Sequence, residues 1–252
     1  MWLKILLILI AILFIAVLII KRFAYFRPSF EFIAPRDAFQ DIYEGNLHAW
    51  LKESPHNTQG YAILFCHGNG GNLSHRQDKI INLSKIGVSV LIFDYSGYGQ
   101  SRGVPNENMC YSNADMFYNF LLRRGYAKNN IIPYGESMGS AVAAYIARKY
   151  NLPKVIIESG LPSMREMAKI CIPKLTFLSI LFPEFDTVNY LTGYKGNILA
   201  MHCLNDEIVP YSIIQSIKQL ASTQGEFIDM EGSHNNVTIP WQRVQNFIFK
   251  HI

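Results

Sequence analysis

A serine framed by glycines, between an apolar run and a helical pattern, is the feature that most limits the folds open to this chain. Gly135-Glu136-Ser137-Met138-Gly139 follows the apolar run 131–134 and precedes the helical pattern 140–147. A G-x-S-x-G pentapeptide alone can be an ordinary glycine-rich turn, but between a strand and a helix it is typical of a nucleophile elbow. A side chain two residues before or after Ser137 would collide with the strand or the helix, which glycine avoids. We therefore predict that Ser137 projects from a tight turn, where the N–H groups of the next helix can stabilise an oxyanion.

The rest of the chain alternates strand-like apolar runs with helical patterns. The run from Tyr61 to Cys66 is unbroken and suits a strand buried on both faces. Such alternation predicts βαβ units, and so an α/β fold with a mainly parallel central sheet and helices on both faces over residues 39–252. The predicted strands are 47–51, 61–66, 88–93, 130–134, 154–157, 197–203 and 226–230, and the predicted helices are 73–86, 106–124, 138–150, 211–221 and 239–251.

The amino-terminal residues favour a membrane anchor. The chain of 252 residues is 17% charged, below the roughly 25% of an average soluble domain. Leu3 to Ile20 is apolar except for Lys4, which is nearly enough to span a hydrocarbon core of about 30 Å. A cleaved signal peptide is the alternative, but its apolar region is shorter, and no Ala-x-Ala precedes Lys21-Arg22. We expect a single transmembrane helix in 1–22 and a juxtamembrane linker in 23–38, and the flanking charges leave the membrane side open.

Composition indicates few other partners. Lys21, Arg22 and Arg27 suit contact with lipid phosphates. No basic stripe with interleaved aromatic residues suggests nucleic acid, and no obligate protein partner is evident. The four cysteines have no C-x-x-C or Cys/His spacing typical of a metal site, so we expect no metal. Cys66 and Cys203 end apolar runs, and we interpret them as small buried residues. No cofactor is expected.

Two polar residues that follow later strands complete a candidate catalytic set. Asp206 comes after the strand 197–203 and His234 after the strand 226–230. Parallel sheets place such residues together at the carboxyl ends of their strands. The order Ser137, Asp206, His234 is that of a serine hydrolase triad, in which the acid orients the histidine and the histidine activates the serine. Glu158, which ends the strand after the nucleophile helix, is the alternative acid.

The loop after the strand 61–66 predicts the oxyanion hole. Its sequence is His67-Gly68-Asn69-Gly70-Gly71-Asn72. The expected donors are the backbone N–H groups of Asn69 and Met138, and glycines let the loop approach the substrate. A phosphate-binding loop is disfavoured because no Gly-Lys-Ser/Thr follows.

Residues 161–186 interrupt the alternation of strands and helices. The segment is rich in methionine, leucine and phenylalanine between prolines. We expect a small lid that binds an acyl chain through Phe177 and Leu181, because flexible apolar side chains suit a hydrocarbon ligand. A plain core helix or a membrane contact is the alternative.

With these residues described, the chain resembles the α/β-hydrolase superfamily of serine hydrolases, and more narrowly its membrane-anchored depalmitoylase branch and bacterial relatives. The resemblance lies in 67–72, 94–101, 135–139, 205–210 and 232–236. The depalmitoylases carry an N-terminal cysteine cluster, whereas this chain has no cysteine before Cys66. The resemblance implies a membrane-anchored serine hydrolase that cleaves a small-molecule or lipid acyl ester or thioester. An aminopeptidase-like amidase and a non-catalytic membrane scaffold are the alternatives.

Overall fold

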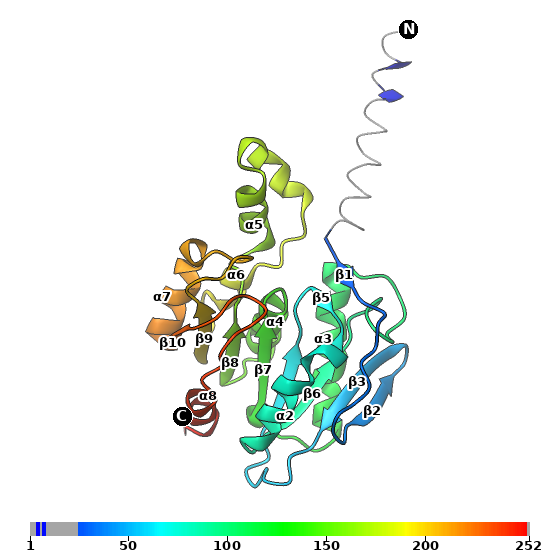
Figure 1. Ribbon diagram of the computed structural model, residues 1–252, viewed down its shortest axis with the longest axis vertical. Coiled ribbons are helices and arrows are strands. Elements are labelled where there is room, and N and C mark those ends of the chain that lie inside the picture. The colour runs from blue at the N-terminus through cyan, green and yellow to red at the C-terminus, as the bar shows by residue number, and fades with distance from the viewer. Residues whose placement is uncertain (1–3, 6, 9–24, 251–252) are drawn as a thin grey trace.

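A single eight-stranded sheet organises the protein. The computed structural model describes residues 4–5, 7–8 and 25–250. The strands lie in the order β10-β9-β8-β7-β4-β6-β3-β2 (Figure 1). From β6 to β10 every neighbour is parallel, whereas β3 pairs antiparallel with both β2 and β6. The prediction of a mainly parallel sheet is confirmed. The strands are β2 (Gln40–Glu44), β3 (Leu47–Lys52), β4 (Ala62–Cys66), β6 (Ser89–Phe93), β7 (Ile131–Glu136), β8 (Lys154–Glu158), β9 (Asn197–Cys203) and β10 (Gly225–Met230).

Helices cover both faces of the sheet, as predicted. One face packs against α3 (Glu107–Arg123), α4 (Gly139–Lys149) and α7 (Gln215–Gln224). The other packs against α2 (Gln77–Lys85) and α8 (Trp241–Phe249). Because both faces are covered, every residue of β4, β6 and β8 is buried, which explains the apolar residues at the centre of each strand.

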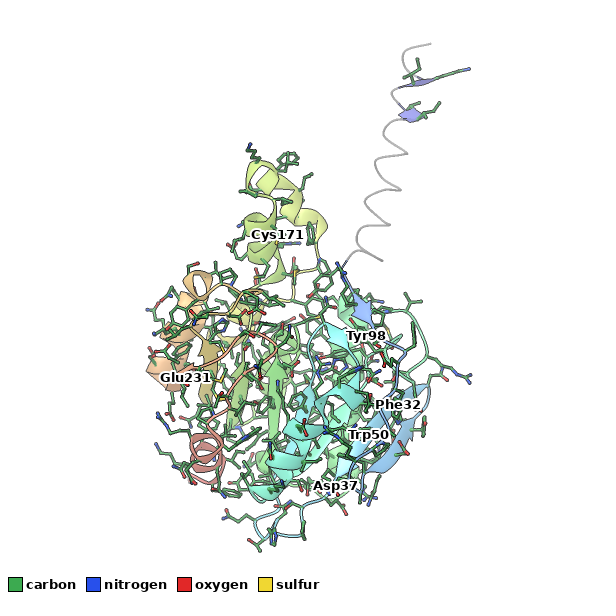
Figure 2. All side chains as sticks on the ribbon, viewed as in Figure 1. Phe32, Asp37, Trp50, Tyr98, Cys171 and Glu231 are labelled. Atoms are coloured by element: carbon green, nitrogen blue, oxygen red, sulfur yellow. The ribbon has the colours of Figure 1, made fainter. Side chains whose placement is uncertain are left out.

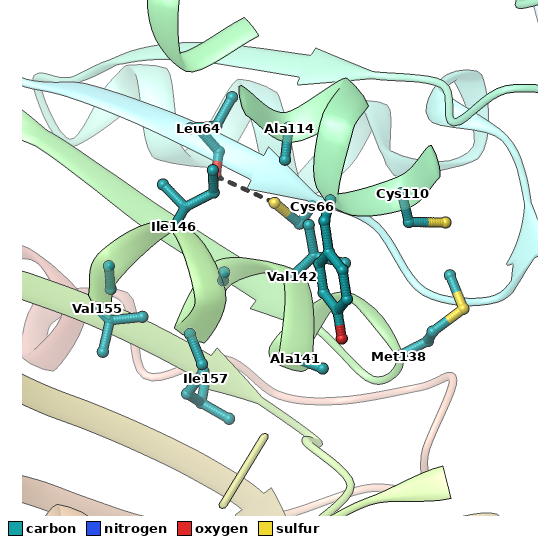
Figure 3. Packing of buried hydrophobic residues seen from close by; sticks show 14 of the residues in the cluster. Leu64, Cys66, Cys110, Ala114, Met138, Ala141, Val142, Ile146, Val155 and Ile157 are labelled. Atoms are coloured by element: carbon teal, nitrogen blue, oxygen red, sulfur yellow. Dashed lines mark hydrogen bonds between the residues drawn. The ribbon is translucent and has the colours of Figure 1, made fainter. Parts of the chain in front are cut away.

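Figure 3 shows the packing of α4 on the sheet. Val142 and Ile146 of this helix lie among Leu64, Val155 and Ile157 of the strands. The remaining helical elements are α5 (Met164–Cys171), α6 (Thr187–Leu191), and the 3₁₀ segments η2 (Leu73–Arg76), η3 (Lys128–Asn130), η4 (Pro173–Leu181) and η5 (Tyr211–Ile213).

The segment expected as a linker packs against the domain from Tyr25 onward. The side chains of Tyr25 and Phe26 are buried. The short strand β1 (Arg27–Pro28) pairs in parallel with β5 (Gly70–Gly71), which lies in the loop after β4. Tyr25 and Phe26 gain burial by lying on the domain, so this part of the segment belongs to the packed structure.

The predicted anchor, residues 1–22, lies for the most part outside the described residues. Within the part of the chain that the structure does describe, no helix is both long enough and apolar enough to cross a membrane.

Candidate active site

Ser137 occupies a strained turn between β7 and α4. Its φ angle is 52°, a left-handed conformation that costs a residue other than glycine about 1–3 kcal/mol. A side chain on Gly135 would lie 2.5 Å from the carbonyl oxygen of Gly139, and one on Gly139 would overlap the carbonyl oxygen of Cys66. The expectation that both positions require glycine is confirmed. The turn therefore projects Ser137 from the carboxyl end of the sheet.

The structure brings Ser137, His234 and Asp206 into one chain of hydrogen bonds. His234 Nε2 lies 3.0 Å from Ser137 Oγ, and His234 Nδ1 lies 2.8 Å from one carboxylate oxygen of Asp206 and 3.0 Å from the other. The three residues follow β7, β9 and β10, whose carboxyl ends share one edge of the sheet. With Nδ1 donating to the carboxylate, Nε2 is left free to accept the serine proton.

The surroundings of Asp206 keep its carboxylate charged. The backbone N–H groups of Val209 and Ile208 donate to Asp206 Oδ1 at 2.7 and 3.0 Å. Burial alone would raise the pKa of Asp206, but the hydrogen bonds from His234 and from these backbone groups outweigh it, so the pKa lies below its ordinary value. Glu207 contributes differently, because its carboxylate accepts the backbone N–H of His234 at 3.0 Å.

The alternative acids are engaged elsewhere. Glu158 is buried and accepts hydrogen bonds from Lys79 at 2.5 Å and from the hydroxyl of Tyr134 at 2.6 Å. Asp94, which follows β6, accepts the backbone N–H of Leu73 at 2.8 Å and so has a structural role. Asp206 is thus the carboxylate that the structure brings to the ring of His234.

The loop after β4 lies against the serine. A side chain on Gly68 would approach Ser137 Cβ to 3.3 Å, so glycine permits this close contact, whereas one on Gly70 would meet nothing within 4 Å. Among the described residues, the N–H groups of Asn69 and Met138 donate no hydrogen bond to another part of the protein. Both groups therefore remain available to a ligand.

Arg76 ties this loop to the residue before the nucleophile. Its guanidinium donates to the carbonyl oxygen of Gly70 at 2.7 Å and to the carboxylate of Glu136 at 2.7 Å. Lys79 donates to the other oxygen of Glu136 at 2.6 Å. Burial opposes the charge on Glu136, but Arg76 and Lys79 outweigh it and hold the pKa of Glu136 well below its ordinary value. These contacts were not expected from the sequence, since no local pattern joins positions 60 residues apart.

The amino-terminal segment also contacts the loop. The side-chain amide of Asn69 donates to the carbonyl oxygen of Tyr25 at 2.6 Å. Its carbonyl oxygen accepts from the backbone N–H of Arg27 at 3.2 Å and from the hydroxyl of Tyr98 at 2.8 Å. The side chain of Asn69 is therefore fixed by the segment that leads into the domain.

A cleft of about 890 Å³ opens at Ser137 and His234. Its wall is mixed in polarity and is formed by the loop after β4, by η2 and α2, and by the residues that follow His234. The residues lining it include Arg27, Asn69, Arg76, Asn235, Val237 and Trp241.

The predicted lid residues do not line this cleft in the described structure. None of the cleft-lining residues comes from 161–186. Phe177 is 70% exposed, and the side chain of Leu181 lies outside the described part of the chain. An acyl-binding role for Phe177 and Leu181 stays a prediction. Among the described residues there is no cluster of side chains that could hold a metal ion.

Comparison with known proteins defines the family. Residues 61–163 match the family model for the alpha/beta hydrolase fold. Alpha/beta hydrolase domain-containing protein 17B of Homo sapiens is 30% identical over 198 residues, covering 76% of this chain and 67% of that protein. An uncharacterized protein of Mycobacterium tuberculosis is 27% identical over 225 residues, covering 86% of this chain and 80% of that protein. The chain belongs to the α/β-hydrolase superfamily.

Solved structures agree with the fold. The esterase Pf2001 of Pyrococcus furiosus superposes with a TM-score of 0.68 at 18% identity, over 90% of this chain and 97% of that one. The thioesterase domain from the curacin biosynthetic pathway superposes with a TM-score of 0.62 at 14% identity, over 85% of this chain and all of that one. These two structures support the fold, and it is the membership of the α/β-hydrolase superfamily that makes the protein a hydrolase.

Proposed function

We propose that the protein is a membrane-anchored serine hydrolase that cleaves carboxylic ester or thioester bonds. The observation that carries the proposal is the continuous hydrogen-bonded chain Ser137–His234–Asp206 at a strained, glycine-framed turn. The left-handed backbone of Ser137 costs local stability, and its retention supports a functional role for this half-buried serine at the cleft.

The geometry suits a two-step acyl transfer. Ser137 Oγ attacks the carbonyl carbon while His234 Nε2 accepts the hydroxyl proton, and Asp206 stabilises the imidazolium. The N–H groups of Asn69 and Met138 donate to the oxyanion of the tetrahedral intermediate. The intermediate collapses to an acyl-enzyme when the leaving alcohol or thiol takes the proton from His234. Water then attacks the acyl-enzyme with His234 as the base, which releases the acid and restores Ser137. None of these steps requires a cofactor.

The apolar amino-terminal sequence supports the membrane anchor, and the structural neighbours support the type of bond that is cleaved. The apolar sequence 3–20 supports an anchor in residues 1–22, with the hydrolase domain held at a membrane. Among the structural neighbours are an esterase and a thioesterase, which supports an acyl ester or thioester as the bond that is cleaved. The substrate we propose is therefore a small-molecule or lipid acyl ester at the membrane.

Labelling with a fluorophosphonate probe tests the nucleophile. The wild-type protein should be labelled and Ser137→Ala should not, while the control Ser222→Ala, on the exposed side of α7, should be labelled like the wild type. Equal labelling of wild type and Ser137→Ala would refute the proposal and favour a non-catalytic scaffold. Turnover of matched ester, thioester and amide substrates then separates the esterase from the amidase.

A further inference from the structure

The segment α5–η4 exposes an apolar surface that nothing in the described structure covers. Ile170, Leu175, Phe177 and Ile180 are exposed by 43%, 46%, 70% and 64%. Figure 2 shows Cys171 on this segment, which projects from the body of the protein. The inner side of α5 is packed, because Met167 and Ala168 are buried. The exposed residues therefore form the outward face of a segment whose base is packed on the domain. We call residues 170–180 the apolar projection.

The apolar projection itself carries a single charge, which is positive. Lys174 is the one charged residue in 170–180. It is exposed and, among the described residues, has no acidic partner within salt-bridge distance, whereas Lys169, just before the projection, pairs with Glu166 at 2.5 Å. Exposed apolar side chains beside an exposed lysine suit an interface with anionic lipid headgroups, where the apolar groups enter the acyl boundary and the cation stays outside.

The apolar projection lies at the same edge of the sheet as the catalytic residues. The segment leading to α5 follows the carboxyl end of β8, and Ser137 follows that of its neighbour β7. The strand β1 lies at this edge too, because its partner β5 follows the carboxyl end of β4 (Figure 1). Further exposed apolar residues follow other strands at this edge, namely Val104 and Met109 after β6 and Leu204 and Ile208 after β9.

Chain length limits how far this edge can lie from the anchor. The ring of Tyr25 packs 5.7 Å from that of Phe185, at the base of the projecting segment. The apolar run ends at Ile20, five residues before Tyr25. Five residues of fully extended chain reach at most about 18 Å. If residues 3–20 span a bilayer, the catalytic edge must lie close to the surface of that bilayer.

From this placement we propose that the carboxyl edge of the sheet docks on the lipid bilayer, with the apolar projection inserted into its interfacial region. The proposal rests on the proposed anchor and deepens the proposed function. Ser137 and His234 then lie at the edge of the sheet that faces the lipid, so the substrates are acyl groups presented from the membrane rather than acyl groups carried by freely soluble molecules.

A fluorescent reporter on Cys171 tests the docking in the full-length protein. Cys171 is exposed, whereas Cys66, Cys110 and Cys203 are buried, so an environment-sensitive dye can be placed there selectively. The matched control carries Cys171→Ser and Lys128→Cys, which moves the dye to η3 before the amino end of β7. In vesicles of phosphatidylcholine and phosphatidylserine that contain a doxyl-labelled lipid, the dye at 171 should be quenched several-fold more than the dye at 128. Equal quenching at both positions would overturn the proposal.

Two other occupants of the apolar projection give different results. If a second copy of the chain covered the projection, the emission of the dye would change as the protein concentration is raised, and doxyl lipid would not quench it. Closure of the segment over a bound acyl chain would shift the emission only when a long-chain inhibitor is added, also without lipid quenching. Either result overturns membrane docking.

The double variant Leu175→Ser/Ile180→Ser separates this proposal from the proposed function. It should lower the quenching at position 171 and reduce turnover of a membrane-embedded acyl substrate about tenfold or more. Turnover of a soluble acetyl ester and labelling of Ser137 should be unchanged. Equal loss on both substrates would overturn the docking role, and absence of serine labelling in the wild type would instead refute the hydrolase. If the double variant does not fold, the reporter on the wild-type surface still decides the question.

Discussion

In the proposed mechanism Asp206 holds the ring of His234 through Nδ1, at 2.8 Å. Asp206→Asn should lower kcat by up to about 10⁴, because an amide in this place favours the wrong histidine tautomer. The measurement is steady-state hydrolysis of an ester, with KM determined separately. Glu158→Gln is the matched control, because Glu158 bonds Lys79 and Tyr134 instead of His234. A larger loss in Glu158→Gln than in Asp206→Asn would move the orienting acid to Glu158.

The burial of His67 should make the folded protein less stable in mild acid. It is fully buried, and its Nδ1 donates to the carbonyl oxygen of Gly68 at 2.7 Å. Burial, reinforced by the charge of Arg76, lowers the pKa of His67 to about 4 from an ordinary 6.5. The unfolded chain therefore binds a proton between these two values while the folded protein does not, so stability falls as the pH falls through this window. The loss is at most about 3 kcal/mol.

Denaturation in urea at pH 7 and pH 4.5 checks this prediction. The wild type should lose stability over the interval, and His67→Gln should lose less, even if it is weaker at pH 7. Burial also lowers the pKa of His202, but both proteins share that group, so the difference between them isolates His67. Parallel losses in the two proteins would contradict the prediction.

At the scale of elements, the strands and helices that could be predicted are those with a clear apolar or helical pattern in their own sequence. The buried strands β4, β6, β8 and β9 and the helices α3 and α4 were predicted to within a few residues. The edge strand β2 was not predicted, because Gln40–Glu44 is polar and mostly exposed and has no apolar alternation. The expected single helix 73–86 begins instead as the 3₁₀ segment η2, where Asn72 caps the first turn.

The same distinction applies to the candidate site. Ser137, Asp206 and His234 could be predicted because each follows a recognisable strand and their order is informative. Arg76 could not, since its role depends on a side chain that reaches the carboxylate of Glu136 and the carbonyl oxygen of Gly70 at once. Contacts of this kind exist only after the helix has packed beside the elbow.

We predict that Arg76 affects catalysis by holding the loop that carries Asn69 in place. Arg76→Met should release the loop that carries Asn69 and so misplace one oxyanion donor. Because that donor acts only in the transition state, kcat should fall about 10- to 100-fold with KM little changed. Arg123→Met is the control, since Arg123 pairs with Glu44 at 2.6 Å at an exposed position outside the cleft. A rise in KM at constant kcat would mean that Arg76 contacts the substrate directly and would contradict a positioning role.

At the scale of the whole molecule, the segment that follows the predicted anchor and the catalytic residues meet at one edge of the sheet. The segment that enters the domain holds the side chain of Asn69 through Tyr25 and Arg27, so the oxyanion loop is bonded to the chain that connects it with the predicted anchor. The catalytic residues, β1 and the apolar projection all lie at the carboxyl ends of the strands. This arrangement could not be predicted from the sequence, because it depends on where residues 25–28 dock.

The anchor itself gives the last prediction. Since Leu3 to Ile20 is nearly uninterrupted and no Ala-x-Ala precedes Lys21, residues 1–22 should stay in the mature protein as a single span. The full-length protein should remain with membranes through an alkaline carbonate wash, and sequencing of the mature amino terminus should find Trp2. A mature chain beginning after Arg22 would refute the anchor. Leu175→Ser/Ile180→Ser should resist the wash like the wild type, because an interfacial contact adds to membrane affinity but a transmembrane helix alone is enough for retention.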